Sequence, residues 1–480
     1  MHFKRIVLDL SDFITQKVLK YKLLLISFLI FSSCVSDKTV AEASYFGGKI
    51  INPKSNKVLF YQSENLLDST ELDHNNKFLF KFDSLKVGLY TFKHDREVQY
   101  VFLEPTDSLL LRLNTWDFDE SLVFSGRGSE RNNLLINLFL ENEKEDKLVY
   151  NFYELNDRLF DLKIDSLLKQ KKLLYALFKE NTVELNPLFD KYINAAIQYP
   201  LYKKKEVYPF RHKKALRLDN FPHMDPAFYK YRKDINLNDQ DLYNFYAYYE
   251  YVRDYLYHLS YEKYIINNTA VPINFLEVTV KHIQIKNLKN RLLDEAMWNI
   301  LLDDNIASED KEAAKELFFE NCDDEKLISS ISSLIKASES PKKGAVFPEV
   351  IALNTADEKI RLNEVMKDKN SVLYFWPRAT FQVESLAKRV HYLEKQHPDI
   401  TFIGINSKHI DYNWKAYIKS NNFNSNNQFC LVNGSTNTDE WLYNDFARAI
   451  LVDKNGVVLN GFTYLSNAKF EQQLKKFKNH

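Results

Sequence analysis

Short hydrophobic runs separated by polar turn residues dominate the first part of the chain. Within residues 44–128 these runs recur at roughly 10- to 20-residue spacing, and polar clusters such as Asp73-His74-Asn75-Asn76 interrupt them. This spacing is typical of strands joined by short turns, and it predicts a small antiparallel β-sandwich. The runs that we expect to form strands are residues 58–61, 78–82, 90–92, 98–103, 108–113 and 122–124.

One segment in the middle of the chain has the period of a helix. Apolar residues that recur at intervals of three and four would give this helix a single apolar face. These residues are Leu242, Phe245, Tyr249, Val252, Leu256 and Leu259. Tyrosines flank this face at positions 243, 246, 248, 251, 255 and 257. They either form a platform for a sugar or protein partner or pack against neighbouring helices, and we favour packing.

The distribution of glycine indicates where the domains begin and end. Of the ten glycines, none lies between Gly128 and Gly344. Because glycine serves turns and positive-φ positions, we predict that residues 129–337 are helical, followed by a linker over residues 338–346. Proline removes a backbone N–H, so the prolines of this region should fall between helices. They are Pro187, Pro200, Pro209, Pro222, Pro226 and Pro272.

The last part of the chain alternates between strand and helix patterns, which predicts an α/β domain over residues 347–480. Its expected strands are residues 371–376 and 399–406, a strand and hairpin are expected over residues 449–456, and its expected helices are 380–396, 414–418 and 467–477.

The N-terminus has a short apolar run that ends close to a cysteine. Three lysines precede this run, which covers residues 23–31 and is too short to span a bilayer but has the length of a signal-peptide core. The run leads into Phe31-Ser32-Ser33-Cys34, which resembles the lipobox of a bacterial lipoprotein signal with Phe31 in place of the usual leucine. The resemblance implies a signal peptide over residues 1–33, diacylglycerol on the sulfur of Cys34 and a tether over residues 34–43. The alternative is an uncleaved amphipathic helix with an incidental cysteine.

Charge and residue types exclude several classes of function. Lys+Arg and Asp+Glu are both 65, so no basic surplus points to nucleic acid, and we interpret the basic blocks at 203–205 and 211–214 as solvated. The three cysteines, Cys34, Cys322 and Cys430, include no CxxC pair, and the eleven histidines form no HxH or HExxH motif. We therefore expect no metal and no cofactor.

The run from Ser371 to Phe375-Trp376, together with Ala449-Ile450-Leu451-Val452-Asp453 before Gly456, resembles the TlpA-like thioredoxin-fold lipoproteins. Residues 44–128 resemble the N-terminal β-domain of unknown function that often precedes such modules. The fold class is therefore predicted as multidomain α+β: an antiparallel β-sandwich, an all-α middle and a C-terminal α/β thioredoxin-like fold.

The resemblance implies a dithiol at two positions that here hold Thr380 and Val383, and a cis-proline where this chain has Ala447. A dithiol enzyme needs one ionised sulfur to attack and a second to resolve the mixed disulfide, which neither threonine nor valine can supply. A cis bond before a non-proline residue costs about 2.5–4 kcal/mol, so we expect Ala447 to be trans. The fold is predicted to be kept and the redox chemistry lost.

Two hypotheses for the function follow. The first is a non-catalytic binding or scaffold lipoprotein of the cell envelope, anchored in a membrane through lipidated Cys34. Its turn at residues 377–383 and its loop at 445–448 would form a groove for a protein or peptide partner. The second is a thiol–disulfide oxidoreductase or a peroxiredoxin-like enzyme that uses Cys322 or Cys430 alone. It requires an accessible cysteine with a lowered pKa beside the groove. A peroxiredoxin alignment would place the reactive cysteine near Gln382 or Val383, and neither is a cysteine.

Overall fold

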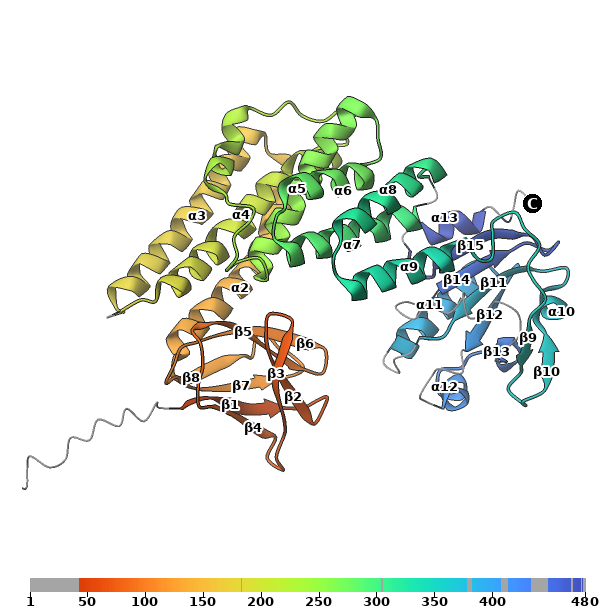
Figure 1. The fold of residues 1–480 in the computed structure, drawn as a ribbon, viewed down its shortest axis with the longest axis horizontal. Coiled ribbons are helices and arrows are strands. Elements are labelled where there is room, and N and C mark those ends of the chain that lie inside the picture. The colour runs from red at the N-terminus through yellow and green to blue at the C-terminus, as the bar shows by residue number, and fades with distance from the viewer. Residues whose placement is uncertain are drawn as a thin grey trace, which may run out of the picture. The chain divides into compact units, whose positions relative to one another are not determined.

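The computed structural model describes residues 43–480 except 183, 304, 378–381, 407–412, 433–447, 468, 476 and 478–480. The chain divides into two compact units. The first unit holds the described residues up to Tyr150 together with Tyr175–Ala196, and the second holds Asn151–Leu174 and the chain from Ile197 onward. β-sheets lie near both ends of the described chain and helices lie between them in sequence, so the fold is a mixed, multidomain α+β fold (Figure 1).

Two four-stranded sheets form the β part of the first unit, in the orders β4-β1-β7-β8 and β3-β2-β5-β6. Their inner faces share a core rich in phenylalanine, in which the Phe46 ring lies 5.5 Å from the rings of both Phe60 and Phe92. The strands are β1 (Ser44–Ile51), β2 (Lys57–Gln62), β3 (Asn65–Glu71), β4 (Lys77–Phe82), β5 (Gly88–His94), β6 (Glu97–Leu103), β7 (Ser108–Asn114) and β8 (Val123–Arg127).

The prediction of a purely antiparallel sandwich is wrong at one pair of strands. β1 lies between β4 and β7 and runs parallel to β7. Its two glycines let the neighbouring strands approach, because a Cβ on Gly47 would lie 2.5 Å from the Phe78 carbonyl oxygen and one on Gly48 would lie 2.1 Å from that of Leu111. Paired glycines that look like a turn in the sequence therefore belong to a central strand.

The glycine-free middle of the chain is helical, as predicted. Its elements are α2 (Ser129–Val149), η1 (Tyr150–Glu154), α3 (Asp157–Glu180), α4 (Pro187–Leu216), η2 (Pro226–Asp234), α5 (Tyr246–Asn267), α6 (Val271–His282), α7 (Lys286–Leu302), α8 (Ser308–Asn321) and α9 (Glu325–Glu339).

The prediction that prolines separate these helices is wrong for Pro200 and Pro209, which both lie inside α4. Pro200 has no N–H to donate to the carbonyl oxygen of Ala196, one turn earlier. The side-chain amide of Asn142 donates to that oxygen instead, at 3.2 Å, so the carbonyl keeps a partner. The remaining prolines stand at helix starts or between helices: Pro187, Pro222, Pro226 and Pro272.

The interpretation of the basic blocks as solvated is wrong for Lys204 and Lys205, which are only 4% and 3% exposed within α4. The Lys205 ammonium forms an ion pair with Asp161 at 2.6 Å and lies over the rings of Phe228 and Tyr231. A buried cation is tolerated here because a carboxylate and two aromatic faces surround it.

The tyrosines of α5 pack inside the helical region. Tyr248, Tyr249 and Tyr251 are buried, and the other tyrosines singled out in the sequence are half-buried. The Tyr248 hydroxyl donates to the Asn236 carbonyl at 2.8 Å. This burial agrees with the interpretation that we favoured, in which the tyrosines pack against neighbouring helices.

A seven-stranded sheet forms the C-terminal part, in the order β10-β9-β13-β12-β11-β14-β15. β11, β12 and β13 are parallel, and β14 and β15 run antiparallel as a hairpin beside β11. The elements are β9 (Ile351–Leu353), β10 (Lys359–Arg361), α10 (Leu362–Met366), β11 (Asn370–Phe375), α11 (Val383–Gln396), β12 (Ile400–Asn406), α12 (Trp414–Ser420), η4 (Ser425–Asn427), β13 (Gln428–Leu431), β14 (Arg448–Val452), β15 (Val458–Tyr464) and α13 (Phe470–Leu474).

Both faces of this sheet are covered. α11 and α13 contribute to the core on one face, and Phe347 with α10 contributes to the core on the other. The segment that we expected to be a linker takes part in the fold: α9 continues to Glu339, and the Gly344 N–H donates to the Val458 carbonyl at 2.8 Å.

Candidate functional site

The candidate site lies where β11 ends and α11 begins. Trp376 and Pro377 follow β11 and are buried, and Val383 opens α11 with no exposed surface. Thr380, the other position at which the family would carry a thiol, lies outside the described residues. Val383 belongs to the core beneath the sheet, together with Leu386 of the same helix. One of the two positions therefore holds a buried hydrocarbon side chain with no ionisable group.

A neutral hydrogen-bond network lies next to this position. The indole N–H of Trp376 donates to Gln428 Oε1 at 3.1 Å, and Gln428 Nε2 donates to the Tyr374 hydroxyl at 3.0 Å. Desolvation raises the pKa of Tyr374, so the hydroxyl stays protonated. Gly404 makes room for the network, since a Cβ there would lie 1.9 Å from Gln428 Oε1. These groups fix the end of β11 but offer no acid, base or nucleophile near neutral pH.

Arg448, the first residue of β14, is fully buried. Its guanidinium donates to the carbonyl oxygens of Ala337, at 2.7 Å, Ser340 and Gly461. Desolvation lowers the pKa of Arg448, while the carbonyl of Ala337 belongs to the last turn of α9, where the helix dipole favours a cation. The side chain thus connects the end of α9 to the C-terminal sheet.

The predicted recognition groove has to be corrected at its edges. We expected residues 377–383 and 445–448 to line it, but Pro377, Val383 and Arg448 are all buried and cannot contact a partner. Ala447, at the position of the family's cis-proline, lies outside the described residues.

The cysteines do not have the surroundings of a reactive thiol. Cys322 and Cys430 are free and buried. Desolvation raises the pKa of Cys322, which is opposite to what a nucleophilic cysteine needs. Cys430 lies in β13 with its sulfur 3.7 Å from the Leu431 carbonyl oxygen. Cys34 lies outside the described residues.

A cluster of charged side chains in the helical region was missed by the sequence analysis. Glu206 of α4 has no exposed surface, and it accepts hydrogen bonds from the guanidinium of Arg232 and, at 2.7 Å, from the Tyr231 hydroxyl. His258 of α5 lies between two carboxylates, with Nδ1 3.2 Å from Glu206 and Nε2 3.2 Å from Glu262.

These contacts set the ionisation of the cluster. Desolvation alone would raise the pKa of Glu206, but hydrogen bonds from His258 and Arg232 outweigh it and lower that pKa. Desolvation alone would lower the pKa of His258, but hydrogen bonds to Glu206 and Glu262 outweigh it and raise that pKa to about 9. Because the two carboxylates are paired with the two cations, the cluster is suited to holding α4, η2 and α5 together rather than to proton transfer.

Neither a metal site nor a membrane span is found in the part of the chain that the structure describes. No group of three or more His, Cys, Asp and Glu side chains is placed to hold a metal ion there. Among the same residues, every helix is too short or too polar to span a bilayer.

No family model matches this chain, and no curated protein matches it. Solved structures do resemble part of it. A thiol:disulfide interchange protein from Bacteroides sp. is 20% identical, with 29% of this chain and 91% of that chain covered and a TM-score of 0.25. The thioredoxin domain of a thiol-disulfide oxidoreductase from Bacteroides vulgatus is 21% identical, with 29% and 99% covered and a TM-score of 0.24.

The class of the C-terminal part follows from its own sheet. A parallel β11–α11–β12 unit, an antiparallel β14–β15 hairpin on the other side of β11 and a closing helix α13 together make a thioredoxin-like domain. This domain is one part of a longer chain that also has two β-sheets and a helical region.

Proposed function

We propose that this protein is an exported, lipid-anchored binding or scaffold protein of the cell envelope whose thioredoxin-like domain does not exchange disulfides. The observation that supports the proposal is Val383, whose methyl groups are fully buried at a position where the family carries a thiol. A hydrocarbon side chain cannot resolve a mixed disulfide, and the threonine at position 380 cannot form a thiolate.

A single-cysteine enzyme is the alternative, and no observation favours it. Such an enzyme needs a thiol that is accessible and has a lowered pKa. Cys322 is buried and its pKa is raised, and Cys430 is buried in a strand of the sheet.

Insulin reduction in the presence of dithiothreitol tests the absence of redox activity. The full chain, a Cys430→Ser variant and a Cys322→Ser variant should all precipitate insulin no faster than dithiothreitol alone. Faster precipitation by the full chain that disappears in either serine variant would establish the enzyme and overturn the proposal.

The anchor is tested separately at Cys34. In a bacterial host, Cys34→Ala should remove labelled palmitate from the protein and shift it out of the membrane fraction, because both acyl attachment and its membrane affinity would be lost. Cys430→Ala is the matched control and should stay labelled and membrane-bound. Retention of Cys34→Ala in the membrane without label would favour the uncleaved amphipathic helix instead.

A further inference from the structure

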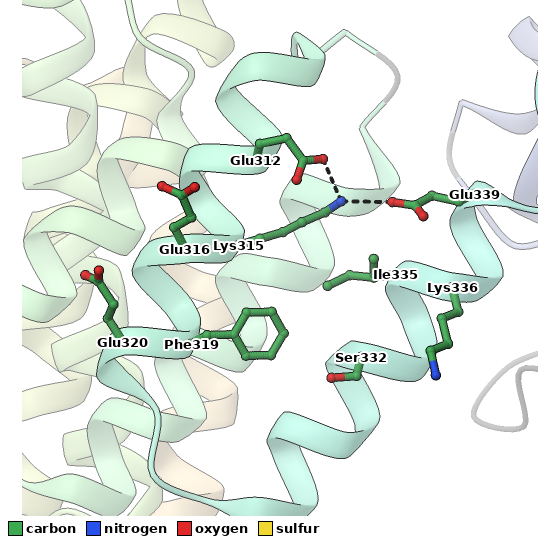
Figure 2. A pocket seen from close by; sticks show the side chains of 9 residues that line it. All are labelled: Glu312, Lys315, Glu316, Phe319, Glu320, Ser332, Ile335, Lys336 and Glu339. Atoms are coloured by element: carbon green, nitrogen blue, oxygen red, sulfur yellow. Dashed lines mark hydrogen bonds and ion pairs between the residues drawn. The ribbon is translucent and has the colours of Figure 1, made fainter.

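α8 and α9 both pack on α7 and leave an open groove between them, with a cavity of about 690 Å³. Figure 2 shows Phe319 of α8 and Ile335 of α9 extending into this groove, whereas Glu316 and Glu320, which also line it, extend from the side of α8 that faces away from α9. One end is bridged by Lys315 of α8, whose ammonium lies 2.8 Å from Glu312 on the same helix and 3.0 Å from Glu339 on α9. The groove is therefore held at a defined width at that end by an ion pair between the two helices.

The walls of the groove expose apolar surface. Phe319 is 42% exposed and Ile335 of α9 is half-buried, and both line the groove. The core beneath is filled by other residues, since Phe318 of α8 and Leu334 of α9 have no exposed surface. Phe319 is thus a large aromatic side chain that the core of the chain leaves partly uncovered.

The rim of the groove has an excess of negative charge. Its lining includes four glutamates and two lysines. Three of the glutamates, Glu312, Glu316 and Glu320, recur once per turn along α8, and such like-charged spacing disfavours the isolated helix. Glu320 lies in the last turn of α8, where the helix dipole also disfavours a carboxylate. Glu316 and Glu320 have no ion-pair partner among the residues that the structure describes.

We propose that the α8–α9 groove is a docking site for a polypeptide segment that carries Lys or Arg side chains around an apolar anchor. The anchor would cover Phe319 and Ile335, and cations one helical turn apart would match the spacing of Glu316 and Glu320. A helix with basic residues at i and i+4 beside a leucine or phenylalanine satisfies both requirements. This inference gives a location and a chemistry to the binding role proposed above, and it rests on that role.

The test is a titration of the full chain with a fluorescent 14-residue helical peptide made of leucine and lysine. A double variant, Glu316→Lys with Glu320→Lys, reverses the two unpaired charges. Glu64→Lys with Glu71→Lys is the control, since it makes the same change in net charge at two exposed residues outside the groove. Phe319→Ala removes the aromatic contact and leaves the charge unchanged.

The groove variant should weaken binding at least about tenfold at low salt and lose most of its salt dependence, whereas the control should bind like the unaltered chain. Phe319→Ala should weaken binding by about tenfold at every salt concentration, because it removes an apolar contact. Circular dichroism should be unchanged in all three, since each altered side chain is exposed.

Three results would overturn the inference. Equal weakening by the groove variant and the control would mean that the peptide responds only to net charge. Equally tight binding of a leucine–glutamate peptide would mean that the rim charges play no part. Self-association of the full chain that the groove variant abolishes would identify a second copy as the occupant. None of these results affects insulin reduction, so the docking site and the lack of redox activity can fail separately.

Discussion

At the scale of single residues, Glu206 is a charged side chain that the helical region buries completely. It is fully buried and its carboxylate is shared by Arg232, His258 and Tyr231. Removing one member of a buried ion cluster leaves the opposite charges without compensation, which costs more than the cluster gains by forming. The contribution of the Glu206 carboxylate to the free energy of unfolding is therefore measured most clearly when Glu206 alone is changed.

We predict that Glu206→Gln lowers the free energy of unfolding by about 3 kcal/mol or more, because the buried His258 and the partly buried Arg232 then lose their ionised partner on α4. Urea unfolding at pH 7 measures the change. Glu262→Gln is the control, since the Glu262 side chain is 51% exposed and its loss should cost less than about 1 kcal/mol. Equal effects of the two substitutions would show that burial at Glu206 does not matter.

The same cluster predicts a dependence of stability on pH. The pKa of His258 is about 9 in the folded chain and 6.5 in its ordinary state, so the protonated form stabilises the fold. This contribution, on the order of 3 kcal/mol, is complete below pH 6.5 and is lost as the pH rises through 9. The charged groups that face the imidazole are Glu206 of α4, Arg232 of η2 and Glu262 of α5.

Urea unfolding between pH 6 and pH 10 should therefore show a falling free energy of unfolding for the unaltered chain. The fall should be smaller for His258→Gln, which has no proton to lose. The same slope in both proteins would assign the pH dependence to other groups.

Residues whose role depends on neighbours in the sequence could be predicted, and residues whose role depends on distant partners could not. The absence of a thiol at Val383 was visible because Phe375 and Trp376 fix the alignment locally. The partners of Gln428 lie more than fifty residues away, and those of Glu206 are twenty-five to fifty-two residues away. No local pattern marks such residues.

At the scale of helices and strands, the predictions failed where the local pattern was absent or where a distant contact compensates for it. β3 was not predicted, because it is exposed along nearly its whole length and its residues show no alternation between apolar and polar. α4 contains two prolines that would end an isolated helix. In that helix Pro200 has no N–H for the Ala196 carbonyl, and Asn142 of α2 donates to that oxygen.

The role of Asn142 as a donor to the Ala196 carbonyl can be tested with a double-mutant cycle at Asn142 and Pro200. Asn142→Leu should lower the free energy of unfolding by about 1–3 kcal/mol, because the buried Ala196 carbonyl loses its donor. In a Pro200→Ala background the residue at 200 has an N–H that can donate to Ala196, so the same Asn142→Leu change should cost less. An identical cost in both backgrounds would contradict the assignment.

At the scale of the whole molecule, the division of the chain places the C-terminal domain and most of the helical region in one compact unit. Arg448 of β14 connects these two parts of the unit, because its guanidinium donates to the carbonyls of Ala337 and Ser340 at the end of α9. Gly461 of β15 allows a second close approach, since a Cβ there would lie 1.9 Å from the Pro341 carbonyl oxygen. The sequence could not show this connection, because Arg448 and Ala337 are 111 residues apart.

We therefore predict that α9 and the β14–β15 hairpin lose protection from hydrogen exchange together, with the same free energy of opening. Arg448→Met keeps the bulk of the side chain but removes every donor, and buried carbonyls without donors are costly. It should increase exchange in the last turn of α9 and in β15, and it should lower the melting temperature by several degrees. Arg448→Lys, which keeps a cation, should have an intermediate effect.

The matched control lies in the other compact unit, where Arg131 pairs with Asp107 at 2.7 Å. Arg131→Met should increase exchange in β7 and α2 and leave α9 and β15 unchanged. Arg448→Met should increase exchange in α9 and β15 and leave β7 and α2 unchanged. If either variant increases exchange in both sets of peptides, the two units do not unfold independently. If Arg448→Met increases exchange in β15 but not in α9, the arginine does not hold α9 to the sheet. The thioredoxin-like domain would then fold without this contact to α9.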